Sequence, residues 1–259
     1  MSSHPWPVTL APVFGVAFSP DGDILATGGV DDTAILWNLS DLAQPRRLGP
    51  PLTGHTSVVS SIAFSPDEDI LATGSTDSTV ILWDLTDLAR PRRLGGPLTG
   101  HIDGVSTVAF SSDGTSLAIS YSDGTVLWDL TDPARPRRLG QPLTGHTGSV
   151  ESLAFSPDGN TLATGSTDST AILWDLGDPA LPRRLGQPLT GHTGGVLSVA
   201  FSSNGDTLAT ASNDNTAILW DLSDLTRPRR LGQPPDWPHQ RRVVGGVRPR
   251  RARSGHWQQ

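Results

Sequence analysis

Four residue types that can do chemistry together recur along the 259-residue chain: histidine, threonine, aspartate and tryptophan. In one stretch they are His55, Thr73, Asp77 and Trp83. An imidazole, a hydroxyl and a carboxylate are the groups of a hydrolase triad, in which histidine takes the proton of a nucleophilic hydroxyl. The same groups can instead form a buried hydrogen-bond chain, because an enclosed imidazole and an enclosed indole N–H both need partners. The first alternative predicts one catalytic cleft, and the second predicts a structural network.

Repetition of this set favours the structural network. Two further complete sets follow at the same spacing: His146, Thr164, Asp168, Trp174, and His192, Thr210, Asp214, Trp220. Two partial sets are Thr27, Asp31, Trp37, and His101, Asp123, Trp128. In these partial sets Thr9 replaces the histidine and Ile119 replaces the threonine. An enzyme does not normally build one active site per repeat, so we expect no catalytic, cofactor-binding or metal-binding residue among them.

The elements that position these residues belong to a unit of about 45 residues, which occurs five times with tryptophans from Trp37 to Trp220. Each unit contains four runs typical of β-strands, which in the second unit are 59–65, 70–75, 79–84 and 92–98. Pro, Asp and Ser residues that favour turns separate the runs, and no window has a sustained helical period. A four-stranded sheet of this size cannot bury both of its faces alone, so we expect the units to stack around an axis.

The repeated unit resembles the WD-repeat β-propeller family. Its marks are a Gly-His pair and, about 30 residues later, a Trp-Asp pair such as Trp83-Asp84. The resemblance covers Phe14 to about Pro234, and it implies the hydrogen-bond network described above. It implies an all-β fold, a β-propeller of five four-stranded antiparallel blades. Family members mostly close about seven blades, so we expect an incomplete or open ring, with a compact five-bladed closure as the alternative.

The expected domain organisation has three parts. Residues 1–12 are an irregular N-terminal segment, 13–234 are the propeller and 235–259 are a basic tail. The five repeats are expected at approximately 13–52, 58–98, 105–143, 150–189 and 196–234. The third repeat is one residue short between Thr125 and Trp128. A missing residue reverses the facing of a strand unless a turn absorbs the loss, so we expect this blade to be the least regular, with a shortened third strand.

The basic tail departs sharply from the repeat in composition. Its residues include six arginines and one aspartate, whereas the rest of the chain has an excess of acidic residues. Codons can be chosen for Pro235 to Gln259 so that reading one base later gives LTGHTSGVWSAAFAPDGRALATGN, a sixth repeat. We therefore predict that the tail is a frameshifted and disordered sixth repeat, which sequencing of the gene can decide. Its charge is then no sign of a nucleic-acid-binding arm.

Composition argues against several classes of site and partner. There is no cysteine, so a disulfide framework, a thiolate metal site and a cysteine nucleophile are excluded. The sequence contains no run of about 18 apolar residues, so it predicts no membrane-spanning helix. The first twenty residues lack a basic region and contain Pro12, so we expect no secretory signal and a cytoplasmic protein. The acidic body opposes binding to phosphates, so we expect neither a nucleic-acid partner nor a membrane partner.

Each unit ends in Pro-Arg-Arg-Leu-Gly, from 45–49 in the first to 228–232 in the fifth. We expect these arginine pairs on the fourth and outermost strand of each blade. Charge on an edge strand resists pairing between the edges of two molecules. A belt that binds an anionic partner is the alternative interpretation.

These observations predict a non-catalytic protein–protein interaction scaffold. In the family, partners usually dock on the face formed by the Gly-His loops and the turns between the second and third strands. Positions there that differ between repeats are the candidate partner contacts: Ser57, Ile102, Asp103, Tyr121, Glu151 and Leu197. The unclosed faces of the end blades would favour self-association.

The resemblance also suggests a regulatory or sensor C-terminal part of a larger signalling protein, because bacterial arrays of this style often follow an ATPase or kinase domain. Two alternatives stay open. One is a nonfunctional gene fragment. The other is a propeller enzyme with a site in the central channel, for which the only singular titratable candidates are Glu68, Glu151 and Tyr121, on different repeats.

Overall fold

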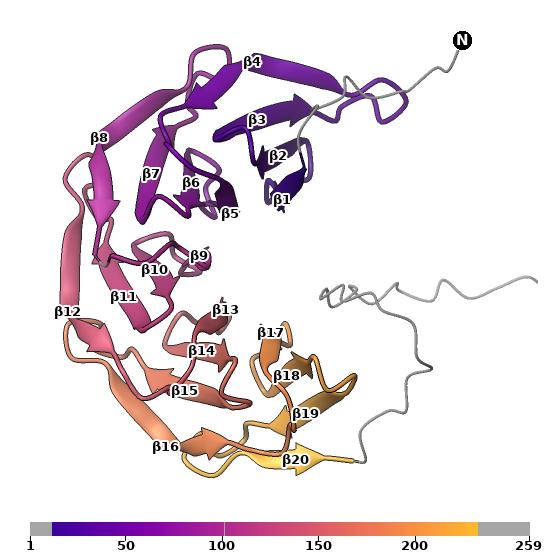
Figure 1. Cartoon of the computed structure of the whole chain (residues 1–259), viewed down its shortest axis with the longest axis vertical. Coiled ribbons are helices and arrows are strands. Elements are labelled where there is room, and N and C mark those ends of the chain that lie inside the picture. The colour runs from indigo at the N-terminus through magenta and orange to yellow at the C-terminus, as the bar shows by residue number, and fades with distance from the viewer. Residues whose placement is uncertain (1–11, 101, 233–259) are drawn as a thin grey trace, which may run out of the picture.

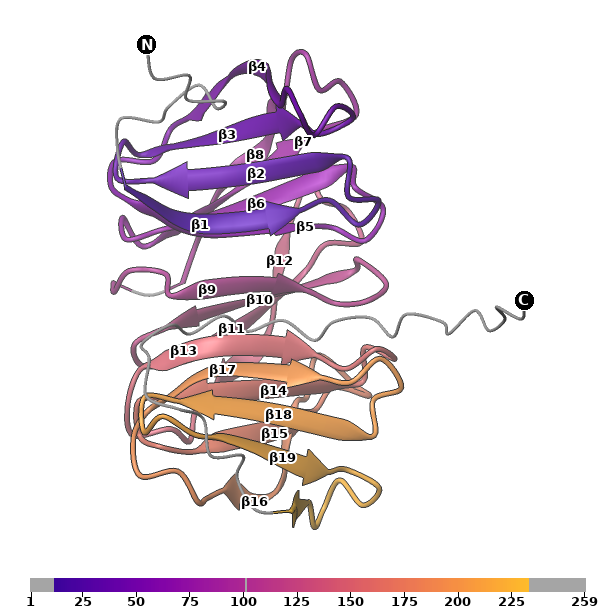
Figure 2. The ribbon, with the colours of Figure 1, turned by 90° about the vertical axis from the view of Figure 1, so that its right-hand side faces the viewer.

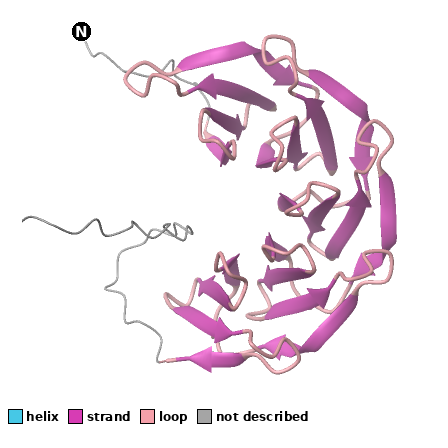
Figure 3. Cartoon of the chain, turned by 180° about the vertical axis from the view of Figure 1, so that it is seen from behind, coloured by secondary structure: helices cyan, strands magenta, loops and turns pink. Residues whose placement is uncertain are grey.

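The computed structural model describes residues 12–100 and 102–232. The expected N-terminal segment, Thr9, His101 and the tail with its predicted frameshift therefore lie outside the described residues, except for Pro12. The described residues form twenty β-strands in five separate sheets of four, and Figure 3 shows strands and loops throughout them. None of these residues forms a helix long and apolar enough to cross a membrane.

Each sheet is one blade, and its strands follow the order of the chain. Blade 1 contains β1 (Val13–Phe18), β2 (Ile24–Gly29), β3 (Thr33–Asn38) and β4 (Arg46–Thr53). Blade 2 contains β5 (Val59–Phe64), β6 (Ile70–Ser75), β7 (Thr79–Asp84) and β8 (Arg92–Thr99). Blade 3 contains β9 (Thr107–Phe110), β10 (Ser116–Tyr121), β11 (Gly124–Asp129) and β12 (Arg137–Leu143). Blade 4 contains β13 (Val150–Phe155), β14 (Thr161–Ser166), β15 (Ala171–Asp175) and β16 (Arg183–Leu189). Blade 5 contains β17 (Val196–Phe201), β18 (Thr207–Ser212), β19 (Ala217–Asp221) and β20 (Arg229–Leu231).

The five blades stand side by side in an arc, as Figure 1 shows. The first strand of each blade lies on the inside of the arc, and the fourth strand lies on its outer rim. Blades 1 and 5 face each other across a gap. The expected fold class, an all-β open propeller of five four-stranded antiparallel blades, is confirmed.

A serine-based turn joins the first two strands of each blade. In blade 4 the backbone N–H of Thr161 donates to Ser156 Oγ at 2.9 Å, and the backbone N–H of Ser156 donates to the Thr161 carbonyl at 2.8 Å. Gly159 has φ +74° inside this turn, which is a conformation that glycine adopts without steric cost. The recurring Ser-x-Asp/Asn-x sequence therefore closes each first hairpin with its own side chains.

The third strand of blade 3 is not shortened, contrary to expectation. Its third strand, β11, has six residues, as many as β7 and one more than β15. The missing residue is absorbed in the turn before it, where Tyr121 pairs directly with Gly124. Leu117 still pairs with Trp128, as Leu71 pairs with Trp83 in blade 2. The prediction of a shortened third strand is wrong, because a tighter hairpin costs less than reversing the buried face of a strand.

The hydrophobic core consists of layers between neighbouring blades. One layer joins Leu36 of blade 1 to Val59 and Ile62 of blade 2, and three similar layers follow along the arc. Close approach depends on small residues: a Cβ at Gly28 would lie 2.5 Å from Val59 Cγ1. Each blade thus offers a first strand with large apolar residues to the blade before it, and a surface with small residues to the blade after it.

The two end blades leave one of these surfaces uncovered. Val16 and Phe18 of β1 are each 62% exposed, whereas Ile62 and Phe64, their equivalents in blade 2, are buried. At the other end Leu219 of β19 is 46% exposed, against 1% for its equivalent Leu173. The same side chains are therefore core residues inside the arc and apolar surface at its ends.

Candidate functional site

The repeated set of polar residues forms a compact network in blade 2. His55 lies in the connection between β4 and β5, Thr73 in β6, Asp77 in the β6–β7 turn and Trp83 in β7. The Nδ1 atom of His55 lies 3.0 Å from Asp77 Oδ2, and its Nε2 atom lies 2.9 Å from Thr73 Oγ1. Trp83 Nε1 donates to the same threonine oxygen at 3.0 Å. The network thus ties a loop, two strands and a turn to one another.

One arrangement of protons satisfies every member of this chain. The indole N–H of Trp83 donates to Thr73 Oγ1, and the Thr73 hydroxyl donates to Nε2 of a neutral imidazole. The remaining ring proton, on Nδ1 of His55, then goes to the Asp77 carboxylate. Each group donates or accepts in the direction that its chemistry allows. Such a chain is a stable way to enclose four polar groups.

The Asp77 carboxylate collects more hydrogen bonds than the spacing alone predicted. Its Oδ2 atom accepts from the backbone N–H of Thr56 at 2.9 Å in addition to His55. Its Oδ1 atom accepts from the hydroxyl and the backbone N–H of Thr79, at 2.7 and 3.0 Å. Burial raises the pKa of Asp77, but the hydrogen bonds from Thr79, Thr56 and His55 together outweigh it and lower the pKa below its usual value.

Blades 4 and 5 repeat the geometry almost unchanged. The distances in blade 4 are 2.9 Å for His146–Asp168, 2.8 Å for His146–Thr164 and 3.1 Å for Trp174–Thr164. The distances in blade 5 are 2.9 Å for His192–Asp214, 2.9 Å for His192–Thr210 and 3.1 Å for Trp220–Thr210. Burial raises the pKa of Asp214, but its hydrogen bonds, the largest from the Thr193 backbone, lower the net pKa to about 2. The pKa of Asp168 is lowered in the same way.

Sequence reasoning missed one member of each network. Thr79, Thr170 and Thr216 follow the aspartate by two positions, and each donates its hydroxyl to that aspartate at 2.7 Å. The signal was present as a threonine at a fixed place after each turn. It was overlooked because a threonine at the start of a strand is common for reasons of β-propensity alone.

The geometry gives the threonine hydroxyl no route to a substrate. Thr73 is fully buried between the imidazole and the indole, and the His55 side chain is almost completely enclosed. A nucleophile must instead face a cleft in which a reacting carbon can lie about 3 Å away. Across the described ranges, His, Asp and Glu side chains do not gather in groups of three or more that could hold a metal ion.

The two partial networks differ in what they lack. In blade 3 the described residues offer no acceptor to Trp128 Nε1, because Ile119 occupies the place of the threonine and is fully buried. Asp123 is exposed in the short turn. In blade 1 Trp37 Nε1 donates to Thr27 Oγ1 at 2.9 Å, so the indole half of the network is complete.

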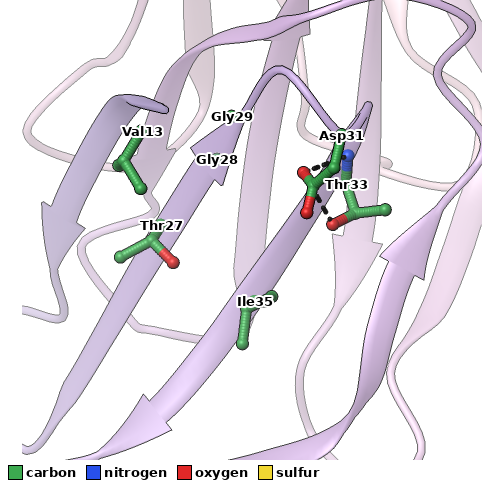
Figure 4. A pocket seen from close by; sticks show the side chains of 7 residues that line it. All are labelled: Val13, Thr27, Gly28, Gly29, Asp31, Thr33 and Ile35. Carbon is green, nitrogen blue, oxygen red and sulfur yellow. Dashed lines mark hydrogen bonds between the residues drawn. The ribbon is translucent and has the colours of Figure 1, made fainter. Parts of the chain in front are cut away.

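A small pocket in blade 1 lies beside the counterparts of the residues that hold an imidazole in blades 2, 4 and 5. Figure 4 shows its lining residues on β1, β2 and β3, with Thr27 on β2 and with Asp31 and Thr33 at the turn between β2 and β3. The remaining lining residues are Val13, Gly28, Gly29 and Ile35. Thr27, Asp31 and Thr33 are the equivalents of Thr73, Asp77 and Thr79. The polar groups that hold His55 in blade 2 therefore all have counterparts in the wall of this pocket.

The candidate partner contacts lie at one end of the strands. This end carries the connections into each first strand and the turns between second and third strands, and we call it the Gly-His face (Figure 2). Ile102 is 96% exposed there and Asp103 is also exposed. Three other candidates are partly exposed: Ser57, Glu151 and Leu197. Tyr121 is fully buried, so its candidacy as a contact is wrong: its position at the end of β10 faces the core between blades 2 and 3, and the equivalent Ser75 is buried too.

The singular titratable residues do not form a common site. Glu68 lies in the β5–β6 turn, at the opposite end of the strands from the Gly-His face, and accepts from the Asp21 backbone at 2.7 Å. Glu151 lies near the start of β13. Burial raises the pKa of Tyr121 to about 12, which makes this phenol a poor acid or base near neutral pH.

Comparison with protein families agrees with this geometry. The model for "WD domain, G-beta repeat" (WD40) matches five segments of the chain: 3–38, 47–84, 93–129, 137–175 and 183–221. The chain belongs to the WD40 family. The last four matches each begin in the outermost strand of one blade and end in the third strand of the next. A comparison with curated proteins finds no match.

Proposed function

We propose that this WD40 protein is a non-catalytic scaffold that binds a protein partner on its Gly-His face, centred on blade 3. WD40 proteins typically act as scaffolds for protein–protein interaction, which supports the general part of the proposal. The observation that carries the specific part is Ile102. A large apolar side chain that is 96% exposed at the tip of a loop gains free energy when a partner covers it.

The loop around Ile102 differs from its counterparts in chemistry as well as in exposure. Other repeats have threonine after the histidine, as at Thr56. The loop of blade 3 is held in place from blade 2, because Ser78 Oγ donates to the Ile102 carbonyl at 2.9 Å. Ser122 Oγ donates to the Asp103 carboxylate. An exposed apolar side chain beside a carboxylate, on a loop whose backbone is hydrogen-bonded to blade 2, suits a partner segment that carries an apolar residue next to lysine or arginine.

Photo-crosslinking tests this proposal with a matched control. A photoreactive residue is placed at position 102 in one variant and at position 42 in another. Leu42 is 78% exposed but lies in the β3–β4 connection, at the opposite end of the strands. We expect a discrete crosslinked partner at position 102 alone, lost in the Asp103→Lys background. Equal crosslinking at both positions would refute the assignment of this face.

Two narrower proposals concern the parent protein and the compartment in which the scaffold works. We infer that the scaffold is the regulatory or sensor part of a larger signalling protein of the bacterial type and that it works in the cytoplasm, where a chain without cysteine needs no oxidising environment. Sequencing the coding region and its flanks tests both this proposal and the alternative of a gene fragment.

A second kind of binding is supported by the end blades, which we propose associate with other copies of the chain. The exposed β1 residues match those that pack between blades inside the arc, and blade 5 presents the matching surface with Ala209 and Leu219. The contact joins different surfaces of two molecules, so it produces a ring of copies if the rotation closes and an open filament if it does not.

A further inference from the structure

One cross-strand pair on the outer rim differs between blade 1 and the four other blades. In blades 2 to 5 the aspartate of the Trp-Asp pair lies directly opposite the first arginine of the outermost strand, as Asp84 lies opposite Arg92. Residues in such positions share a face of the sheet, so their charges offset each other. Hydrogen bonds from Thr86 are the main cause that lowers the pKa of Asp84, and the charge of Arg92 lowers it further. In blade 1 Asn38 lies opposite Arg46, so this arginine has no carboxylate in the cross-strand position.

The asparagine keeps the structural role of the aspartate and lacks only its charge. Asn38 Oδ1 accepts from the backbone N–H of Ser40 at 2.8 Å, as Asp84 Oδ1 accepts from that of Thr86 at 2.9 Å. Because the amide oxygen is used in the turn, the Nδ2 amino group of Asn38 remains as a donor. Within the described residues, neither this amino group nor the Arg46 guanidinium has a hydrogen-bond or ion-pair partner. Blade 1 thus presents two donor groups where the other blades place a donor beside an acceptor.

The two side chains lie at the seam between blades 1 and 2, where the structure describes both sides. Leu36, two positions before Asn38, packs in the core layer shared with blade 2, and side chains two positions apart point to the same face of a strand. Asn38 therefore faces blade 2. Across the seam, β4 meets the β7–β8 connection, because a Cβ at Gly49 would lie 3.1 Å from the Leu88 carbonyl oxygen. Figure 1 shows β4 and β8 following each other along the outer rim at this place.

This seam carries one positive charge more than its counterpart between blades 2 and 3. Arg93 of blade 2 reaches the seam, since its guanidinium donates to the Thr53 carbonyl of β4 at 2.6 Å. The β7–β8 connection adds Asp87 and Arg90, which are both exposed. Blade 3 contributes the same residue types to the next seam, namely Asp132, Arg135 and Arg138. The additional charge therefore comes from Asn38 alone.

We propose that the seam between blades 1 and 2 binds a carboxylate of an acidic polypeptide segment of a partner protein. The carboxylate accepts from the Arg46 guanidinium and the Asn38 amino group, and it supplies from outside the acceptor that the other blades carry within their own sheets. Carboxylates spaced along a polypeptide suit this rim better than nucleic acid does, because the aspartates that remain along it, such as Asp87, repel the dense charge of phosphates. The site lies at the opposite end of the strands from the Gly-His face, so it goes beyond the proposed function.

Exchange of the asparagine tests the proposal with two variants that change the charge equally. The probe is a fluorescent decaglutamate peptide added to the full chain, and fluorescence anisotropy measures its binding at physiological ionic strength. Asn38→Asp restores the pair of the other blades and keeps the acceptor for Ser40, so we expect the affinity to fall at least about threefold. Asn160→Asp, at an exposed position in the β13–β14 turn, should leave the affinity unchanged, because charges more than about 8 Å away are largely screened.

Two further variants keep the test decisive if Asn38→Asp does not fold. Arg46→Gln removes the guanidinium and should weaken decaglutamate binding at least about threefold. Asp84→Asn copies the pair of blade 1 into blade 2, where Arg92 then lies opposite an amide. We expect the apparent affinity to rise at least about twofold, because a second site becomes available on the same chain.

Several results would overturn the proposal. These are no binding at millimolar decaglutamate, or equal binding by wild type, Asn38→Asp and Arg46→Gln. A ten-residue thymidine oligonucleotide that binds as tightly as decaglutamate would also overturn it, since the rim would then be a general site for polyanions. The crosslinking at position 102 reports on the Gly-His face, so either proposal can fail without the other.

Discussion

Replacing Thr73 by valine is the most direct test of the repeated network. Valine has nearly the shape of threonine but neither donates nor accepts. The substitution leaves Trp83 Nε1 without its acceptor at 3.0 Å and His55 Nε2 without its donor at 2.9 Å. Each enclosed polar group without a partner costs about 1–3 kcal/mol, so the free energy of unfolding should fall by about 2–4 kcal/mol after allowing for the extra apolar contact of valine.

Blade 3 supplies the matched control, because Ile119 already occupies the equivalent buried position. Ile119→Val loses one methylene and should cost only about 0.5–1.5 kcal/mol. Urea unfolding followed by tryptophan fluorescence measures both variants, and the double variant with Trp83→Phe measures the coupling between hydroxyl and indole. If Thr73→Val costs no more than Ile119→Val, the hydroxyl does not hold the network together and the structural interpretation fails.

Three other predictions concern acid stability, association and packing. The pKa of Asp214 is lowered to about 2 from 3.8, so its contribution to stability is complete above about pH 4 and is lost as the pH falls toward 2. Acid titration of Asp214→Asn should accordingly show a shallower loss of stability than wild type between pH 5 and 2, and equal slopes would contradict the prediction. Val16→Asp should lower the concentration-dependent increase in sedimentation coefficient, whereas Leu42→Asp, far from the end surfaces, should not. Gly74→Val should destabilise the chain by about 1–3 kcal/mol in urea unfolding, because even its Cβ would lie 2.6 Å from Val105 Cγ1, while Ala211→Val on the open surface of blade 5 should be tolerated.

The fold and the complete networks could be predicted from sequence because repetition makes them redundant. A single His55 or Asp77 has many interpretations, but the same spacing in three units leaves few. The strands could be predicted for the same reason, since every unit must contain the same four strands in order to bury the faces of its neighbours. The sequence predicted the four members of each network but not Thr79, which also donates to Asp77. The spacing of side chains does not reveal which backbone turn a carboxylate caps.

The errors arose where one unit departs from the others. The missing residue in the third repeat was assigned to β11, whereas the structure places it in the turn after Tyr121. Sequence cannot rank these two solutions, because their relative cost depends on the packing of both faces of the sheet. The burial of Tyr121 has a different origin, because the equivalent Ser75 and Ser166 are also buried in blades whose hairpin has the usual length.

Departures from the repeat are also where binding should be sought. Apolar positions that recur in all five units pack between blades, and at the ends of the arc they become surface because no neighbouring blade among the described residues covers them. That surface is general, since Val16 and Leu219 could pack against any blade of the same kind. The loop at Ile102 is specific, because an exposed isoleucine at this place occurs in the third repeat while Thr56, Thr147 and Thr193 occupy it in the second, fourth and fifth. We therefore expect a partner that distinguishes this chain from other WD40 arrays to contact the loop at Ile102, where substitutions should change its binding while leaving the stability of the fold intact.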